Sequence, residues 1–155
     1  MTGEFERLAF ETALRALDKQ ETLLEELRAR TGVLLAASSL VAAFLGQQGF
    51  QDPDPGALAV VALAAFVALV LASVYILYPK KALIFAESGS GLYEGLYALR
   101  EDLPEVYRRL AYDLQRFWDS NDHTIVRLTR AYAFAAIALV IEILSLAALL
   151  SGNIF

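Results

Sequence analysis

Apolar and charged residues occupy separate parts of this 155-residue chain. No charged residue occurs in 31–49 or in 57–79, and Glu142 is the single charged residue of 131–155. These stretches are about 19 to 25 residues long, and an α-helix needs about 20 apolar residues to cross the hydrocarbon of a bilayer. The pattern predicts three transmembrane helices, at about 31–49, 57–79 and 131–152.

A cytoplasmic amphipathic helix is predicted for 1–30. Its leucines recur at helical spacing on one face: Leu14, Leu17, Leu24 and Leu27. No residue that breaks a helix occurs before Gly32. We therefore expect this helix to continue unbroken into the first span.

Proline and glycine mark the ends of the first two spans. Pro53, Pro55 and Gly56 form a short connection, which predicts a tight turn and an antiparallel hairpin over 31–79. Pro79 interrupts the second span where it leaves the membrane, and "SGSG" at 88–91 is typical of a turn.

The segment 80–130 predicts a further helical region. Its apolar positions alternate at spacings of four and three: Leu103, Tyr107, Leu110, Leu114 and Phe117. Asp102 is a suitable N-cap and Pro104 a suitable first-turn residue. Asn121 or Asp122 offers another N-cap, which predicts a new helix that continues into the third span. With no β pattern, the predicted fold class is all-α: an integral membrane protein with three transmembrane helices and a small cytoplasmic helical layer.

The basic residues predict the orientation. All 13 lysines and arginines fall in 1–30 and 80–130, and short cytoplasmic loops are enriched in these residues. The N-terminus and 80–130 should lie in the cytoplasm and the C-terminus outside, in a multi-pass protein of the cell (inner) membrane. The net charge of −5 is dispersed over alternating acidic and basic residues and indicates no particular partner.

Glu142 is the ionisable group inside a predicted span. A carboxylate at the centre of a lipid-facing helix costs about 2.5–3.5 kcal/mol on insertion scales, so such groups usually face protein or water. Counting along the third span in alternating steps of three and four places the acid on a stripe of mostly small or polar residues: Ala135, Ala138, Glu142, Ser145, Leu149 and Gly152. Small residues let helices approach closely, so the stripe is a candidate interface.

Two hypotheses explain this acid. In one, it fixes helix packing as a neutral or hydrogen-bonded group, with a serine as partner: Ser38, Ser39, Ser73 or Ser145. In the other, copies of Glu142 line a cation path in a symmetric oligomer. Because no basic residue lies near it along its own helix, we expect a cyclic homo-oligomer of about four or more copies, with Glu142 facing the axis or a subunit seam.

Other candidate sites rest on fewer features. The cytoplasmic segment holds residues that could contact an anionic ligand: Arg108, Arg109, Arg116, Tyr93 and Tyr97. A solvated basic surface is the alternative. His123 has no second histidine or cysteine at ligand spacing. No catalytic set can be assembled, so we expect no enzyme activity, no metal, no cofactor and no nucleic-acid partner.

Two stretches have a recognisable pattern. "LLEELRARTGVLLAASSLVAAFLG" reads as a charged helix that enters a small-residue span, and "YRRLAYDLQRFWDSNDHTIVRLTRAYAFAAIALVI" reads as a cytoplasmic helix that leads into the last apolar segment. Both resemble the corresponding parts of the small prokaryotic membrane effectors of the Pycsar and SLATT type. The resemblance implies antiviral defence in which a cyclic nucleotide or a partner enzyme triggers membrane disruption.

Two functions follow as hypotheses. The first is an oligomeric membrane effector that forms a pore or perturbs the bilayer. The second is a non-enzymatic membrane scaffold whose cytoplasmic helices bind a partner protein.

Overall fold

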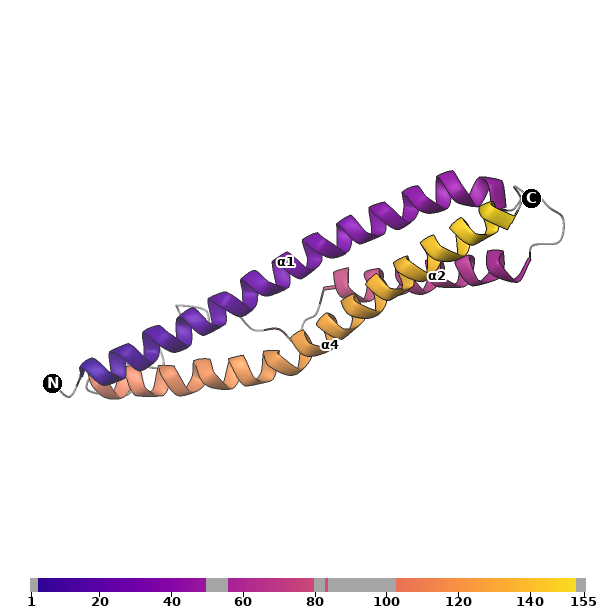
Figure 1. Ribbon diagram of the computed structural model, residues 1–155. Coiled ribbons are helices and arrows are strands. Elements are labelled where there is room, and N and C mark those ends of the chain that lie inside the picture. Colours follow the sequence, from indigo (N-terminus) through magenta and orange to yellow (C-terminus); the bar gives the residue numbers. More distant parts are fainter. Residues whose placement is uncertain (1–2, 50–55, 80–82, 84–102, 153–155) are drawn as a thin grey trace. The chain divides into compact units, whose positions relative to one another are not determined.

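The computed structural model describes residues 3–49, 56–79, 83 and 103–152. These residues form three α-helices and no strand: α1 (Glu4–Gly49), α2 (Ala57–Leu77) and α4 (Leu103–Gly152) (Figure 1). The prediction of an all-α fold is confirmed for this part of the chain. The predictions for Asp102, for "SGSG" at 88–91 and for the connection over 51–55 concern residues outside the described part of the chain.

The helices form two compact units. The first comprises Met1–Glu25 and Pro79–Val126, and the second comprises Glu26–Tyr78 and Arg127–Phe155. After the helices that the structure describes in each, they are called the two-helix unit and the three-helix unit. The boundaries between them fall within α1 and α4. Helix α1 is continuous from Glu4 to Gly49. This confirms the prediction that the N-terminal helix continues without a break through 31–49.

The predicted N-cap at Asn121 or Asp122 is wrong. Helix α4 continues without a break from Leu103 to Gly152, with Pro104 in its first turn as expected. Asn121 is only 1% exposed. It lies seven residues before the buried Leu128, so its side chain belongs to the packed face of a continuous helix.

Pro79 ends α2 as predicted. The last helical residue is Leu77, and Tyr78 has the extended dihedrals φ −61° and ψ 129°. Proline disfavours the helical conformation of the residue before it, because its ring would clash with that residue's backbone. Tyr78 still donates its N–H to the Val74 carbonyl at 2.9 Å, which closes the last turn.

The core of the three-helix unit is built from small and aliphatic side chains. Leu69 of α2 packs with Ala135 and Ala138 of α4, and all three are buried. Leu35, Ala72 and Leu139 pack against this cluster. The predicted stripe of α4 is thus its inward face from Ala135 to Ser145.

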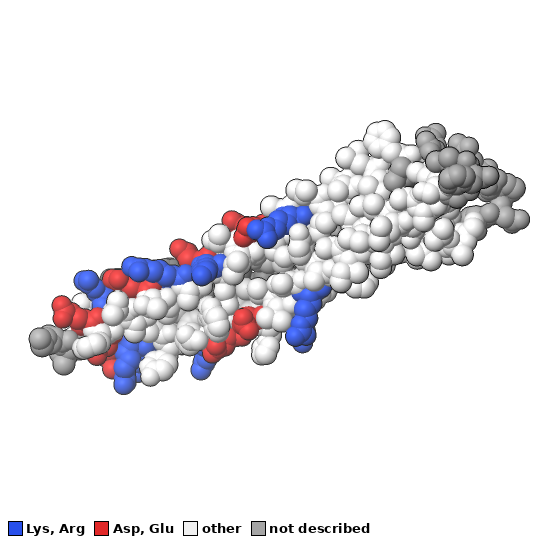
Figure 2. Space-filling view, viewed as in Figure 1, with Lys and Arg blue, Asp and Glu red and all other residues white. Residues whose placement is uncertain are grey.

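The outer faces of the same helices are apolar. On α2, large aliphatic side chains are exposed: Leu58, Val60, Val61, Leu63, Val67, Leu71 and Val74. Figure 2 shows no charged side chain on the visible surface of the predicted spans. By length and composition, all three described helices are able to cross a membrane, which fits a multi-pass membrane protein.

The two-helix unit packs the first part of α1 along the first part of α4. Leu17 and Leu24 are buried, and the rings of Phe10 and Tyr107 lie with their centroids 5.6 Å apart. Leu14, predicted on the same face, is 45% exposed. The buried leucines are seven residues apart, and this spacing leaves Leu14 at the edge of the packed face.

Candidate functional site

Glu142 lies inside the three-helix unit. Its side chain is 1% exposed, although α4 otherwise exposes large apolar residues on both sides of it, such as Ile141 and Ile143. The α-helical period places Ala138 and Ser145 on the same face, and both are buried too. The sequence therefore turns the one acid of the span toward the neighbouring helices.

Ser38 of α1 is the hydrogen-bond partner of this acid. Its Oγ donates to Oε2 of Glu142 at 2.5 Å. The other carboxyl oxygen, Oε1, is buried and has no hydrogen-bond partner within the described part of the chain. None of the ion pairs among the described residues involves Glu142. Among the described residues, the carboxyl group thus accepts one hydrogen bond, although it could accept several.

The other predicted serine partners do not bond the acid. Ser39 is exposed, and its hydroxyl donates to the carbonyl of Leu35 in its own helix at 2.8 Å. Ser145 is buried one turn along α4, on the same face as the acid. Four of the five residues predicted to form the pore or interface are buried, and Ser39 is exposed. The buried residues are Ser38, Ala138, Glu142 and Ser145.

Ser73 lies at a different level of the bundle. It is fully buried on α2, and its Oγ has no partner among the described residues. Helix α2 runs antiparallel to α4 (Figure 1), and Leu69 packs against Ala135 and Ala138. One turn beyond Leu69, Ser73 therefore lies farther from Glu142, not closer to it.

This geometry bears on the two hypotheses for the acid. Its burial under helices of its own chain and its hydrogen bond with Ser38 support the packing hypothesis, whereas the buried Oε1 without a partner among the described residues supports a functional role of the acid. The seam hypothesis expected Glu142 at a surface where copies of the chain meet. In the single chain the residue is instead buried. The number of subunits stays a prediction.

The arginines predicted to hold an anionic ligand lie beside carboxylates. Arg108 and Arg109 line a shallow groove of about 480 Å³ together with Glu105, Tyr112 and Asp113. Nη2 of Arg108 donates to Oε1 of Glu105 at 2.7 Å, and this hydrogen bond and charge raise the pKa of Arg108. The carboxylates compete with any anion for these guanidinium groups.

The remaining members of that predicted set do not join them. Arg116 is exposed and does not line this groove. Tyr93 and Tyr97 lie outside the described residues. His123 is exposed on α4, and no group of three or more potential metal ligands occurs in the described part of the chain.

A larger, mainly apolar groove lies in the two-helix unit. It has a volume of about 710 Å³. Its apolar lining comes from both helices: Phe5, Leu8, Ala9, Ala13 and Ala16 of α1, and Ala111 and Tyr112 of α4. Its polar lining is Glu6, Thr12, Arg108 and Gln115. This groove was not predicted from the sequence, although its α1 residues recur at helical spacing.

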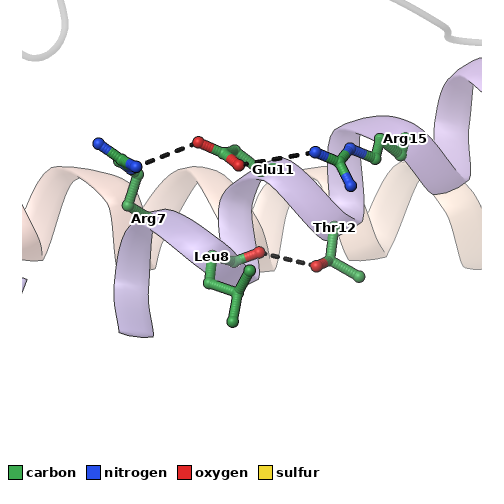
Figure 3. Close-up of polar contacts among 5 residues, drawn as sticks. All are labelled: Arg7, Leu8, Glu11, Thr12 and Arg15. Atoms are coloured by element: carbon green, nitrogen blue, oxygen red, sulfur yellow. Dashed lines mark hydrogen bonds and ion pairs between the residues drawn. The ribbon is translucent and has the colours of Figure 1, made fainter. Parts of the chain in front are cut away.

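Three charged residues of α1 form ion pairs on a side of the helix that does not line the groove. Glu11 pairs with Arg7 at 3.3 Å and with Arg15 at 3.8 Å. Figure 3 shows these three side chains on one side of the helix and Leu8 and Thr12 on another. The charged side and the groove side of α1 are therefore distinct surfaces.

Buried polar residues were also missed. Gln20 is 5% exposed and donates from Nε2 to the carbonyl of Trp118 at 3.2 Å, while its Oε1 is buried without a partner among the described residues. Thr31 is fully buried and donates to the carbonyl of Leu27. A seven-residue repeat could have revealed these faces: Leu17, Leu24, Thr31 and Ser38 on α1, and Asn121, Leu128, Ala135 and Glu142 on α4.

Comparisons with family models, with curated proteins and with solved structures gave no match to this chain. The resemblance to Pycsar and SLATT effectors stays a prediction.

Proposed function

We propose that this chain is a multi-pass protein of the cell membrane, with its N-terminus and residues 80–130 in the cytoplasm and its C-terminus outside. Three apolar helices of sufficient length and the exposed aliphatic face of α2 support the membrane location. The distribution of all 13 basic residues supports the orientation.

Within that membrane, the proposed function is an oligomeric effector of about four or more copies that forms a pore or perturbs the bilayer. The observation that carries it is the buried Oε1 of Glu142, which has no partner among the described residues. An acid inside a span is costly and usually marks a functional site. Rearrangement or assembly that brings water or a cation to this oxygen would remove the cost.

Cation leak from liposomes tests this proposal. Purified wild-type protein should release potassium from loaded vesicles, and Glu142→Gln should change the rate, because the amide keeps the shape but cannot ionise. Ser38→Ala should also change the leak, since it removes the hydrogen bond to the acid. Ser39→Ala is the matched control, because that hydroxyl bonds only within its own helix turn. Vesicles that stay sealed with every variant would contradict the effector function.

A second function is supported by the Ser38 contact itself. If Glu142 serves only to lock α4 against α1, the chain is a membrane scaffold whose two-helix unit binds a partner protein. Glu142→Gln would then alter thermal stability without any leak. The same pair of measurements, leak and stability on one set of variants, therefore separates the two functions.

The resemblance adds a trigger to the effector proposal: a cyclic nucleotide or a partner enzyme in antiviral defence. Phage challenge of cells that carry the gene with its natural neighbours tests this addition. Equal plaque numbers with wild type and Glu142→Gln would remove the defence role and leave the leak result standing.

A further inference from the structure

We propose that Glu142 binds a proton in the packed three-helix unit and that release of this proton loosens α4 from α1, so that pH controls the leak. The inference rests on the proposed function for its effect on the membrane, and it adds how that site is regulated. The effect on packing is measured without a leak.

The surroundings of Glu142 suit a neutral acid and not a carboxylate. Its side chain is 1% exposed, Oε2 accepts one hydrogen bond from Ser38, and Oε1 has no partner in the described part of the chain. An incomplete set of hydrogen bonds costs a neutral group far less than it costs a buried charge. Burial with one donor therefore favours the form that holds a proton.

The basic residues of the three-helix unit lie far from the acid along their helices. On α1, the charged residue nearest to Ser38 in sequence is Arg30, eight residues or about 12 Å away along the helix, and it pairs with Glu26. On α4, Arg130 is 12 residues or about 18 Å from Glu142. Helix α2 has no charged residue. A carboxylate at this position would therefore have no cation to balance it among the described residues.

Tyrosines are the other titratable groups of these helices. Tyr75 and Tyr78 follow Ser73 at the end of α2 that lies farther from Glu142, and both are exposed. Tyr132 precedes the acid on α4 by ten residues, or about 15 Å. A tyrosine is neutral below about pH 10, so these rings add no charge at the acid.

A proton fits this site better than a metal ion. The hydrogen-bonded pair offers the two carboxyl oxygens of Glu142 and the hydroxyl of Ser38. Ser39 is exposed and bonded within its own helix, and Ser73 lies at another level. A metal ion such as calcium takes about six to eight oxygen ligands, whereas a proton needs one.

Release of the proton leaves a buried negative charge. The O–H bond of the carboxyl group breaks, the proton passes to water, and the carboxylate keeps the single hydrogen bond from Ser38. The cost of this charge falls when the acid reaches water. Because Glu142 is enclosed by its contact with α1, it reaches water when α4 moves away from α1. The ionised acid therefore opens the seam that the neutral acid closes.

Unfolding in SDS at a series of pH values tests the bound proton. Wild type is compared with Glu142→Gln, because the amide cannot ionise and every other titratable group is unchanged. An exposed glutamate is half ionised at about pH 4.3, so the unfolded chain releases the proton above this pH while the packed unit keeps it. The unfolding equilibrium constant of wild type, divided by that of Glu142→Gln, should therefore rise about tenfold per pH unit until the packed acid also ionises. Ser39→Ala is the control and should follow the wild type.

Potassium release from vesicles with equal pH on both sides tests the regulation. The wild-type leak should rise with pH by up to about tenfold per unit, as the ionised fraction of Glu142 does. Glu142→Gln should give a low leak that does not change with pH. Ser39→Ala should show the pH dependence of the wild type.

Two results would overturn the inference. A ratio of unfolding constants that stays the same at every pH would show that the packed unit binds no additional proton at Glu142. A wild-type leak that ignores pH, or that has the same pH dependence in Glu142→Gln, would exclude the regulation while leaving the effector function in place. Vesicles that stay sealed at every pH would instead contradict the effector function, and the ratio of unfolding constants would then decide the proton site alone.

Discussion

Replacing Ser38 with alanine is expected to destabilise the three-helix unit. The substitution removes the hydroxyl that donates to Oε2 of Glu142 at 2.5 Å. Because Oε1 already has no partner in the described part of the chain, both oxygens of a fully buried carboxyl group would then lack a hydrogen bond.

The expected cost follows from the burial of that group. Hydrogen bonds between membrane helices contribute about 0.6 kcal/mol on average and up to about 1.7 kcal/mol. A buried polar group left without a partner costs about 1–3 kcal/mol. We therefore expect Ser38→Ala to lower the free energy of unfolding by about 1–2 kcal/mol. Ser39→Ala should change it by less than about 0.5 kcal/mol, since Ser39 is exposed and bonds within its own helix.

Reversible unfolding in SDS micelles, followed by circular dichroism, measures these free energies. A second background sharpens the result: in Glu142→Leu, which has no carboxyl group to satisfy, Ser38→Ala should cost almost nothing. The reasoning is refuted if Ser38→Ala is as mild as Ser39→Ala, or if its cost is unchanged in the Glu142→Leu background.

Three further predictions concern packing and topology. Leu69→Ala should lower the free energy of unfolding by about 2–5 kcal/mol, because it leaves a cavity at a fully buried site in the core of the three-helix unit. Leu71 is 65% exposed on the same helix, so Leu71→Ala should lower it by less than about 0.5 kcal/mol. Unfolding in SDS measures both values. Gln20→Leu should raise the melting temperature, because it removes a buried oxygen that has no partner among the described residues; a lower value would show that its hydrogen bond outweighs this gain. In intact cells, an impermeant maleimide should label Asp54→Cys but should label His123→Cys only after permeabilisation, and the reverse pattern would contradict the orientation.

Local features of the sequence predicted much of the fold. The charge-free stretches located the apolar parts of α1, α2 and α4, and Pro79 fixed the end of α2 because its effect acts on the adjacent residue. Helical periodicity also identified the inward face of α4 around Glu142. An acid within an apolar stretch is expected on the face that avoids lipid, and this face is buried in the structure.

Features that depend on packing between helices were harder to predict. Asn121 has the side chain of a good N-cap, but contacts of the packed face keep α4 continuous through it. Ser38 and Ser39 are chemically identical, and only their angle about α1 decides which one reaches the acid. The seven-residue repeat that ends at Ser38 would have distinguished them.

Electrical recording from planar bilayers tests the proposed effector function most directly. With purified wild-type protein in a potassium chloride gradient, we predict discrete current steps whose amplitude or reversal potential changes in Glu142→Gln and does not change in Ser39→Ala. A bilayer that stays silent with reconstituted oligomer, or currents that are identical in Glu142→Gln, would contradict a role of this acid in membrane permeation.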